Sequence, residues 1–469
     1  MIVGVLMALP EPVGRQREVV YLPTSGHQVI LGTAGSGKTT MAVLRAALLS
    51  HIDCPGSGKT LLITFNKTLG AYIRFLASDV LDQVTVENFH LFARGYLSAR
   101  GQMKGTAILP VHFYEGLVGK AVSNITAKHN PHAFFSRPIS FFKDEIRWLS
   151  RHGIVSASDY SSASRTGRAD ARLVRALRPT MWEIFLEYRR LREEAGYRYD
   201  VDDIASAVAN AFENDDTPRL YKHILVDEGQ DLTPEMLRAL SKAVPKDGSF
   251  TFFGDVAQQI YGNQMTWRSA GLKPIKIWQF EENYRNTKAI ADLAVAISRM
   301  PYYAGEADLV VPKQPSAEGP KPTLVHCSNI DEEITFVVDR ASRLSRTRSV
   351  AILTRTRAQA RLFSEKLSGA RQLKSSLTIW KEEPGISIGT LHNGKGLEFD
   401  VVILPHLSDD LFPHPVAIES NGSEDATVTD GRLLYVGVTR ARKALLLSYS
   451  GNKSMLLPSD ESLYMEVEK

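Results

Sequence analysis

The chain has 469 residues, 43% of them apolar and 23% charged, with a formal net charge of +4 and an isoelectric point near 8.8. These values are typical of a globular protein with roughly two to four domains, and they exclude a disordered or fibrous chain. The slight basic excess is weak support for a polyanionic partner. Cys54 and Cys327 are the only cysteines. They are too few for a disulfide framework or a cysteine metal cluster, so we expect a reducing, cytoplasmic location.

The opening run MIVGVLMALP is apolar and ends at Pro10. It carries no basic leader and is shorter than a signal peptide or a membrane-spanning helix, and no later run reaches spanning length. We therefore expect no membrane partner.

A candidate phosphate loop, GTAGSGKT (32–39), lies between an apolar run from His27 to Leu31 and a helix-forming run from Thr40 to Leu49. Phosphate loops need this order, because a glycine-rich turn after a strand brings the first amides of a helix close to phosphate oxygens. Lys38 would add a catalytic charge, and Thr39 would offer a hydroxyl to Mg²⁺. The expected phosphate-binding residues are Gly32, Gly35, Ser36, Gly37, Lys38, Thr39 and Thr40.

The letters GSGKT recur at 56–60, but this second copy fails the pattern. Asp53 stands where the first glycine is needed, Pro55 interrupts, and the run 61–65 that follows is typical of a strand rather than a helix. We therefore interpret 54–60 as a surface loop and expect a single nucleotide site. A phosphate loop alone leaves kinases, GTPases, transporters and motor ATPases open.

Arginines at helix-like spacing mark the segment between 137 and 198. This pattern fits either a solvated helix face or a surface for a polyanion, and the sequence does not separate the two. The arginines concerned are Arg165, Arg168, Arg172, Arg175 and Arg178.

The apolar run 223–226 ends in two acids, Asp227 and Glu228. In a phosphate-loop fold such a strand lies beside the loop, so that Asp227 can hold the Mg²⁺ shell and Glu228 can deprotonate the attacking water. Acids are also common where ordinary strands leave a sheet, so this pair gains its weight from the motifs around it.

With these motifs in place the chain resembles the UvrD/Rep/PcrA group of superfamily 1 helicases. The resemblance covers most of the length, and its two longest motifs near the end are the most specific. Gly229 departs from the family, which has a bulky residue there, and predicts a looser strand end. The motifs are, in order, GRQREVV (14–20), LLITFNK (61–67), TVENFH (85–90), DEGQD (227–231), GDVAQQIYG (254–262), ENYRNT (282–287), GTLHNGKGLEFDVVIL (389–404) and YVGVTRAR (435–442).

For the nucleotide, the resemblance implies ATP with Mg²⁺ in a cleft between two domains. Arg440 and Arg285 would reach the γ-phosphate from the second domain, where an arginine supplied in cis stabilises the charge of the transition state. By the same resemblance, Gln258 would contact the γ-phosphate, Gln16 and Tyr284 would contact the adenine, and Glu398 would contact the ribose.

For nucleic acid, the resemblance implies a single strand held by aromatic rings under the bases and by polar contacts to the backbone. Phe65 and Trp267 occupy the motifs in which the family places such rings. The expected polar contacts are Thr64, Asn66, His90, Thr390 and His392.

The expected fold is α/β, with two RecA-like parallel-sheet motor domains in tandem and a helical accessory insertion in the first. The first motor domain is expected at 1–90 and 207–273, the insertion at 91–206, and the second motor domain at 274–469. A second accessory insertion, which family members often carry, is nearly absent between 363 and 386. Strands of the second domain are predicted at 275–280, 323–327, 350–354, 386–390, 400–404 and 444–449.

The resemblance implies an ATP hydrolase that moves along single-stranded DNA and separates tailed duplex DNA. The motifs at 389–404 and 435–442 look like those of the 3′-to-5′ branch, so we expect movement in that direction. Two alternatives stay open. One is a translocase that unwinds only with a protein partner, such as a nuclease or a repair or defence protein. The other is a non-catalytic nucleic-acid-binding module with a degenerate site, and RNA as the substrate also stays open.

Overall fold

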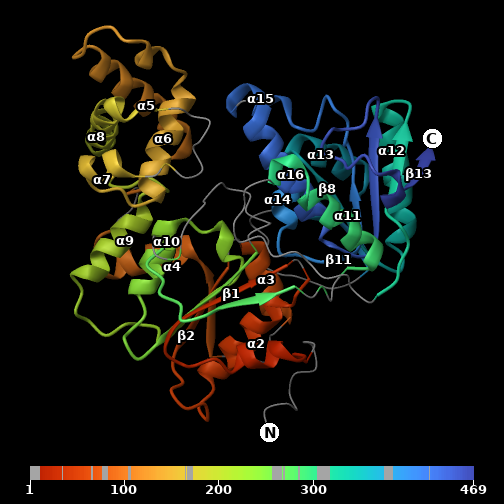
Figure 1. Cartoon of the computed structure of the whole chain (residues 1–469), viewed down its shortest axis with the longest axis horizontal. Helices are drawn as coiled ribbons and strands as arrows, with labels where there is room; N and C mark the ends of the chain where they lie inside the picture. The colour runs from red at the N-terminus through yellow and green to blue at the C-terminus, as the bar shows by residue number, and fades with distance from the viewer. Residues whose placement is uncertain are drawn as a thin grey trace.

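The computed structural model shows two lobes with a helical insertion standing on the first (Figure 1). The described residues are 11–33, 35–64, 67–76, 83–103, 107–163, 165, 173–255, 267, 270–281, 283, 286–303, 317–373, 384–421 and 423–469.

The first lobe is built on a six-stranded parallel sheet with the strand order β3-β2-β4-β5-β1-β6. Side chains alternate between its two faces, as in β1, where Val29 and Leu31 enter one hydrophobic cluster and Ile30 enters the other. Because the strands are parallel, their carboxyl ends meet at one edge. The strands are β1 (Gly26–Gly32), β2 (Thr60–Thr64), β3 (Val84–Asn88), β4 (His223–Val226), β5 (Ser249–Gly254) and β6 (Ile277–Phe280).

Helices cover both faces of this sheet. The face that contains Ile30 is packed by α1 (Arg15–Val20), α2 (Lys38–Ser50) and α3 (Lys67–Leu76). The opposite face is packed by α4 (Phe89–Ala99), α9 (Ile204–Glu213) and α10 (Pro234–Lys242). The lobe is therefore a three-layer α/β sandwich.

The insertion is a separate bundle with its own hydrophobic core. Its chain enters and leaves at neighbouring points, because Leu109 N donates to Tyr199 O (2.8 Å) and Tyr199 N donates to Ala107 O (2.9 Å). The helices of the bundle are α5 (Val111–Thr126), α6 (Ile139–Arg151), α7 (Ala157–Ser162) and α8 (Arg178–Glu194).

Two of the described arginines of this bundle, Arg165 and Arg178, do not lie on the exposed helix face that their spacing allowed. Arg165 follows α7 in a loop and forms a buried ion pair with Glu145 of α6. Arg178 begins α8 and donates to backbone carbonyls, among them Tyr160 O (2.7 Å). The solvated-face interpretation is wrong for these two residues, because their guanidinium groups hold the bundle together. Arg168 and Arg172 lie outside the described residues.

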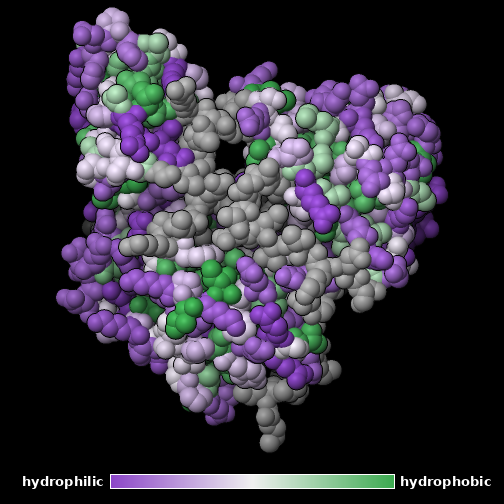
Figure 2. Space-filling view, viewed as in Figure 1, coloured by the Kyte–Doolittle hydropathy of each residue, from purple (hydrophilic) through white to green (hydrophobic). Residues whose placement is uncertain are grey.

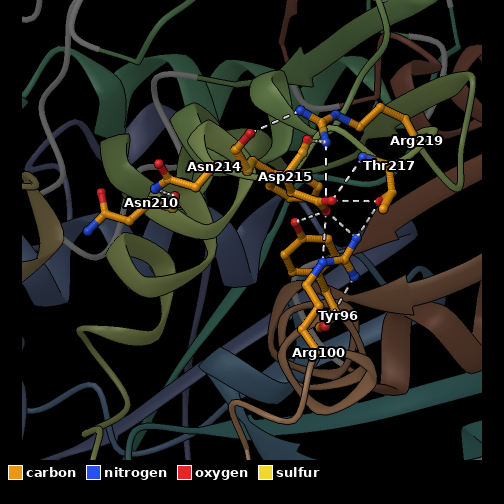
Figure 3. A network of polar contacts seen from close by, with 8 residues as sticks. Tyr96, Arg100, Asn210, Asn214, Asp215, Thr217 and Arg219 are labelled. Carbon is orange, nitrogen blue, oxygen red and sulfur yellow. Dashed lines mark hydrogen bonds and ion pairs between the residues drawn. The ribbon is translucent and has the colours of Figure 1, made fainter.

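A polar network below the insertion joins α4 to the connection between α9 and β4 (Figure 3). The carboxylate of Asp215 accepts hydrogen bonds from Tyr96 Oη (2.6 Å), Arg100 Nε (2.8 Å) and Thr217 Oγ1 (2.6 Å). Arg219 adds a contact to the backbone oxygen of Asp215 (2.8 Å). The network fixes the end of α4, which precedes the insertion, to the segment that follows α9.

The second lobe has a seven-stranded parallel sheet with the order β13-β7-β12-β11-β8-β10-β9. Its strands are β7 (Thr323–Cys327), β8 (Ser349–Thr354), β9 (Arg371–Gln372), β10 (Gly385–Thr390), β11 (Phe399–Leu404), β12 (Ala441–Ser450) and β13 (Met465–Glu468). Its helices are α11 (Lys288–Ser298), α12 (Ile330–Leu344), α13 (Arg357–Lys366), α14 (Leu391–Gly394), α15 (Pro415–Asn421) and α16 (Ser423–Val438).

Five of the six strands predicted for the second lobe are present there, each within a few residues of its expected bounds. The strand predicted at 275–280 exists, but its assignment to the second lobe is wrong. That segment forms β6, whose residues 277–280 pair with β1 in the first sheet. Hydrophobicity marked the strand correctly, but its edge position depends on long-range pairing that a local pattern does not encode.

The two lobes are in direct contact between the α14–β11 connection and the start of α3. A Cβ atom placed on Gly396 would lie 2.7 Å from Leu69 Cδ1, so the backbone of one lobe touches a side chain of the other. One hydrophobic cluster runs through both lobes.

The exterior in view is mainly hydrophilic, with small separated apolar patches (Figure 2). Within the described ranges, no helix combines the length and the apolar character that crossing a bilayer would require.

Candidate nucleotide site between the two lobes

The phosphate-loop candidate connects the carboxyl end of β1 to α2, as predicted. Gly37 precedes the helix with a φ of 82°, a left-handed conformation that favours glycine. Lys38 Nζ donates to the carbonyl oxygens of Gly32 (2.8 Å) and Thr33 (2.7 Å) and lies 3.7 Å from Asp255 Oδ2. The ammonium group is therefore held inside the turn, next to the amides that begin α2.

The second GSGKT is a loop, as predicted, and it lies at the opposite edge of the sheet. It comes before β2, whereas the phosphate loop follows β1, and the two strands run in parallel. His223 Nε2 lies 3.0 Å from Gly56 O, which anchors this loop at the amino end of β4. Its five letters repeat those of the phosphate loop, but neither the residues before them nor its position relative to the strands fits one.

Gln16 of α1 holds the outer side of the phosphate loop. Its Nε2 donates to Ser36 O (3.0 Å), and its Oε1 accepts from Val13 N (3.0 Å). The amide is fixed at both ends and lies beside Gly37. Its predicted contact with adenine stays a prediction.

The acidic strand end lies beside the loop, because β4, β5 and β1 are neighbours in the sheet. Thr39 Oγ1 donates to Asp227 Oδ2 at 2.9 Å. Asp227 Oδ1 is buried and has no hydrogen-bond partner among the described residues. A threonine hydroxyl beside a carboxylate with an unused oxygen fits Mg²⁺, which binds oxygen ligands and keeps the rest of its shell for water and phosphate.

Burial and charge separate the acids of this box. Burial, and then the Glu228 carboxylate, raise the pKa of Asp227 to about 7. Burial acts in the same direction on Glu228, but the positive charges of Lys395, Lys38 and Arg440 outweigh it, so the pKa of Glu228 is lowered. Burial also raises the pKa of Asp231 to about 7, against the attraction of Lys395. Of the three acids, Glu228 is therefore the one whose ionised form these surroundings favour most.

The turn after β4 fixes the direction of the Glu228 carboxylate. Glu228 has a φ of 53°, a left-handed conformation that is uncommon outside glycine. Gln230 Nε2 donates to Glu228 Oε2 (2.5 Å), and Gln230 Oε1 accepts from Asp255 N (2.9 Å). The box at the end of β4 is thereby tied to the GD motif at the end of β5.

Two cations of the second lobe reach this box. Lys395, which follows α14, places Nζ 2.6 Å from Asp231 Oδ1, and both side chains are at most 2% exposed. Arg440 lies between α16 and β12 and is 1% exposed. Its Nε donates to Val436 O (3.0 Å), and its charge acts on Glu228 and Asp231. The acids of one lobe and the cations of the other thus share one site.

The remaining predicted nucleotide residues are distributed as follows. Gly32, Gly35 and Ser36 are buried in the loop, Thr40 is half-buried in the first turn of α2, and Glu398 is half-buried just before β11. Gln258, Tyr284 and Arg285 lie outside the described residues.

The predicted nucleic-acid contacts come from both lobes. Thr64 ends β2, and His90 is at the start of α4. Thr390 caps α14, accepting a hydrogen bond from Asn393 N (3.3 Å), and His392 lies within that helix. Trp267 is half-buried, with its ring edge-on to Phe252 at a centroid distance of 5.0 Å. Phe65 and Asn66 lie outside the described residues.

Three residues of the site were missed from the sequence: Asp231, Lys395 and Asp255. Each lies inside a motif that the sequence already marked, DEGQD, GTLHNGKGLEFDVVIL or GDVAQQIYG. One signal in the sequence could have found them: each is a charged residue inside a recognised motif to which no contact had been assigned. The partners are side chains distant in the sequence, so the pairing itself requires the fold.

A phosphate loop and an acidic strand end at the joined carboxyl edge of a parallel sheet define the phosphate-loop nucleotide-binding class. The chain belongs to the UvrD-like helicases. The model of the UvrD/REP helicase N-terminal domain matches residues 13–284, and the model of the UvrD-like helicase C-terminal domain matches residues 370–452. The predicted family and the predicted pair of RecA-like parallel-sheet domains are confirmed.

Several curated proteins are similar to the chain. ATP-dependent DNA helicase UvrD2 of Mycobacterium tuberculosis is 24% identical, over 94% of this chain and 79% of that protein. ATP-dependent DNA helicase PcrA of Leuconostoc citreum is 24% identical, over 75% of this chain and 48% of that protein. A solved C-terminal domain of a possible DNA helicase from Lactobacillus plantarum covers 39% of this chain and 97% of its own, at 24% identity and a TM-score of 0.29.

Proposed function

We propose that the chain is an ATP- and Mg²⁺-dependent enzyme that moves 3′-to-5′ along single-stranded DNA and separates tailed duplex DNA. The observation that supports it most is the meeting of Lys395 and Arg440 of the second lobe with Asp231 and Glu228 of the first. A nucleotide in the phosphate loop would lie where the lobes share charges. Its binding and hydrolysis would therefore alter how the lobes contact each other, and a motor requires this coupling.

In this proposal each residue has a defined part in hydrolysis. Lys38 and Arg440 balance the charge that develops on the γ-phosphate, and Glu228 takes the proton of the attacking water. Thr39 and Asp227 would hold Mg²⁺, which would supply charge neutralisation at the phosphates. In this proposal Arg285 and Gln258 also contact the γ-phosphate. Gln16 and Tyr284 contact the adenine, and Glu398 contacts the ribose.

The proposed substrate is DNA, and the proposed path of the strand crosses both lobes. The similar proteins named UvrD2 and PcrA are ATP-dependent DNA helicases by name, which supports DNA over RNA. The forms of the motifs at 389–404 and 435–442 resemble the 3′-to-5′ branch of the family. The proposed strand contacts are Thr64, Phe65, Asn66, His90, Trp267, Thr390 and His392.

The first prediction is that single-stranded DNA stimulates ATP hydrolysis strongly, and RNA of equal length does so less. The rate should rise with strand length before it saturates, because a translocating enzyme hydrolyses ATP until it reaches the strand end. Steady-state ATPase assays over a series of strand lengths measure this. Lys38→Ala, with an unchanged melting profile, is the control for background hydrolysis. A rate independent of DNA length would remove the translocation proposal.

A narrower activity is supported by the short connection between α13 and β10. Only residues 367–384 separate these elements, where family members often carry a second accessory insertion. In that case the chain would translocate but would separate strands only with a protein partner. Unwinding of a 3′-tailed duplex, with a 5′-tailed duplex as its matched control, by the purified chain at catalytic concentration distinguishes the two activities.

A further inference from the structure

An ion pair between the lobes lies within the candidate site. Lys395 Nζ of the second lobe lies 2.6 Å from Asp231 Oδ1 of the first, across 164 residues of sequence. Their side chains are 2% and 0% exposed. A buried pair of this kind fixes relative position strongly, because moving either partner away leaves a charge buried without compensation.

On the first lobe, Asp231 ends the turn that carries the proposed general base. The short helix Gly229–Asp231 begins directly after Glu228, and Asp231 N donates to Glu228 O (3.0 Å). Glu228 itself has the left-handed backbone described above. A residue in such a conformation keeps it only while its surroundings hold it, so the orientation of the Glu228 carboxylate depends on where Asp231 is held.

On the second lobe, Lys395 is the residue that directly follows α14. The same four-residue helix is capped by Thr390 and contains His392, two of the proposed contacts to the DNA strand. A helix this short moves as one unit with its cap. A strand that binds Thr390 and His392 would therefore set the position of Lys395.

We propose that Lys395 is a positioning residue that transmits DNA binding on α14 to the Glu228 turn through its ion pair with Asp231. The inference rests on the proposed function, and it adds the route by which the strand stimulates hydrolysis. Lys395 does not touch the reacting atoms in this proposal. It acts through Asp231.

The test compares ATP turnover with and without single-stranded DNA. In Lys395→Met we expect the DNA-stimulated kcat to fall by roughly 10- to 100-fold, the scale of a misplaced catalytic group. The DNA-free rate should also fall, because the Lys395 charge acts on Glu228 as well, but by a smaller factor; the KM for ATP and the affinity for a labelled oligonucleotide should stay close to those of the parent. A residue that only supported the fold would lower both rates in the same proportion. Lys395→Arg, which keeps the charge, should recover part of the stimulation.

Two further variants keep the test decisive. Lys395→Met/Asp231→Asn removes both charges, so it leaves no unpaired buried carboxylate if the single variant melts early; it should also lack stimulation. Lys366→Met makes the same change at an exposed lysine of α13 and should behave as the parent.

Full stimulation in the single or the double variant would overturn the proposed route while leaving the proposed function standing. Absence of stimulation in the parent chain would overturn both. The two failures are therefore told apart by the parent chain alone.

Discussion

Phe252 explains why the acidic box contains a glycine. Its ring occupies the space beside Gly229 and Gly254, where a Cβ atom on either glycine would overlap the ring carbons. The sequence predicted a looser strand end at Gly229, and this expectation is wrong. The volume that a larger residue would supply from β4 comes instead from β5, and Phe252 is 1% exposed.

The second prediction is that Gly229→Ala impairs both stability and turnover. The added methyl group must displace Phe252 or the backbone of the box, at a cost of about 1–3 kcal/mol for an overpacked core. Thermal melting and DNA-stimulated ATPase assays measure the two effects. Gly229→Ala/Phe252→Leu should recover part of each loss. Gly95→Ala on α4, where no atom lies within 4 Å of the added Cβ, is the matched control. A Gly229→Ala variant as stable and as active as the parent would contradict this account of Phe252.

Positions in the site that follow from a local pattern were predictable from the sequence, and positions that depend on a distant partner were not. The chemical roles of these residues stay predictions. Lys38 and Thr39 follow a glycine pattern that carries its own geometry. Asp227 could be placed because a strand beside a phosphate loop ends in it. Asp231 and Lys395 have no such local pattern, since each acquires its role only from the other.

At the scale of elements, buried parallel strands were the most predictable part of the fold. β8, for example, was predicted at 350–354 and lies at Ser349–Thr354, because an unbroken apolar run, here from Val350 to Leu353, is characteristic of such a strand. β6 was found but assigned to the wrong sheet. The insertion was predicted as helical, yet its arginine spacing was misleading, because Arg165 and Arg178 serve tertiary contacts rather than one helix face.

The third prediction is that Arg165→Ala destabilises the insertion. Arg165 Nε donates to Glu145 Oε1 (2.7 Å), and the Glu145 side chain is fully buried, so the change leaves a buried carboxylate with Tyr160 Oη as its remaining partner in these contacts. Loss of one partner of a buried pair costs about 3–5 kcal/mol. Hydrogen exchange of the amides in α6 and α7 reports the effect locally. Arg175→Ala removes an exposed arginine and should leave exchange unchanged; equal exchange in both variants would show that the pair is not structural.

At the scale of the whole molecule, the lobes meet through two kinds of contact. One is the hydrophobic cluster that includes Leu69 of α3 and Leu397 near α14. The other is the set of charges on which Lys395 and Arg440 act. The hydrophobic cluster holds the lobes together without fixing their orientation, whereas the charge pairs form only in one relative position of the lobes.

The fourth prediction is that Arg440→Ala binds nucleotide nearly as well as the parent but loses hydrolysis. An arginine that stabilises the transition state contributes about 10³- to 10⁵-fold to the rate. Titration with a fluorescent ATP analogue and single-turnover hydrolysis measure the two properties separately. Arg440→Lys keeps the charge without the planar guanidinium and should fall between the two. Hydrolysis at the parental rate in Arg440→Ala, with a normal melting profile, would show that Arg440 is not this group.

The paired backbone at Leu109 and Tyr199 has a consequence for how the molecule can change over time. The chain leaves and re-enters the first lobe at neighbouring points, so the residues between Leu109 and Tyr199 form an insertion whose two ends are already held together. Lengthening, shortening or exchanging this inserted segment would leave the strand order and the carboxyl edge of the sheet as they are. Changes of sequence and length can therefore accumulate in the insertion without altering the first-lobe sheet.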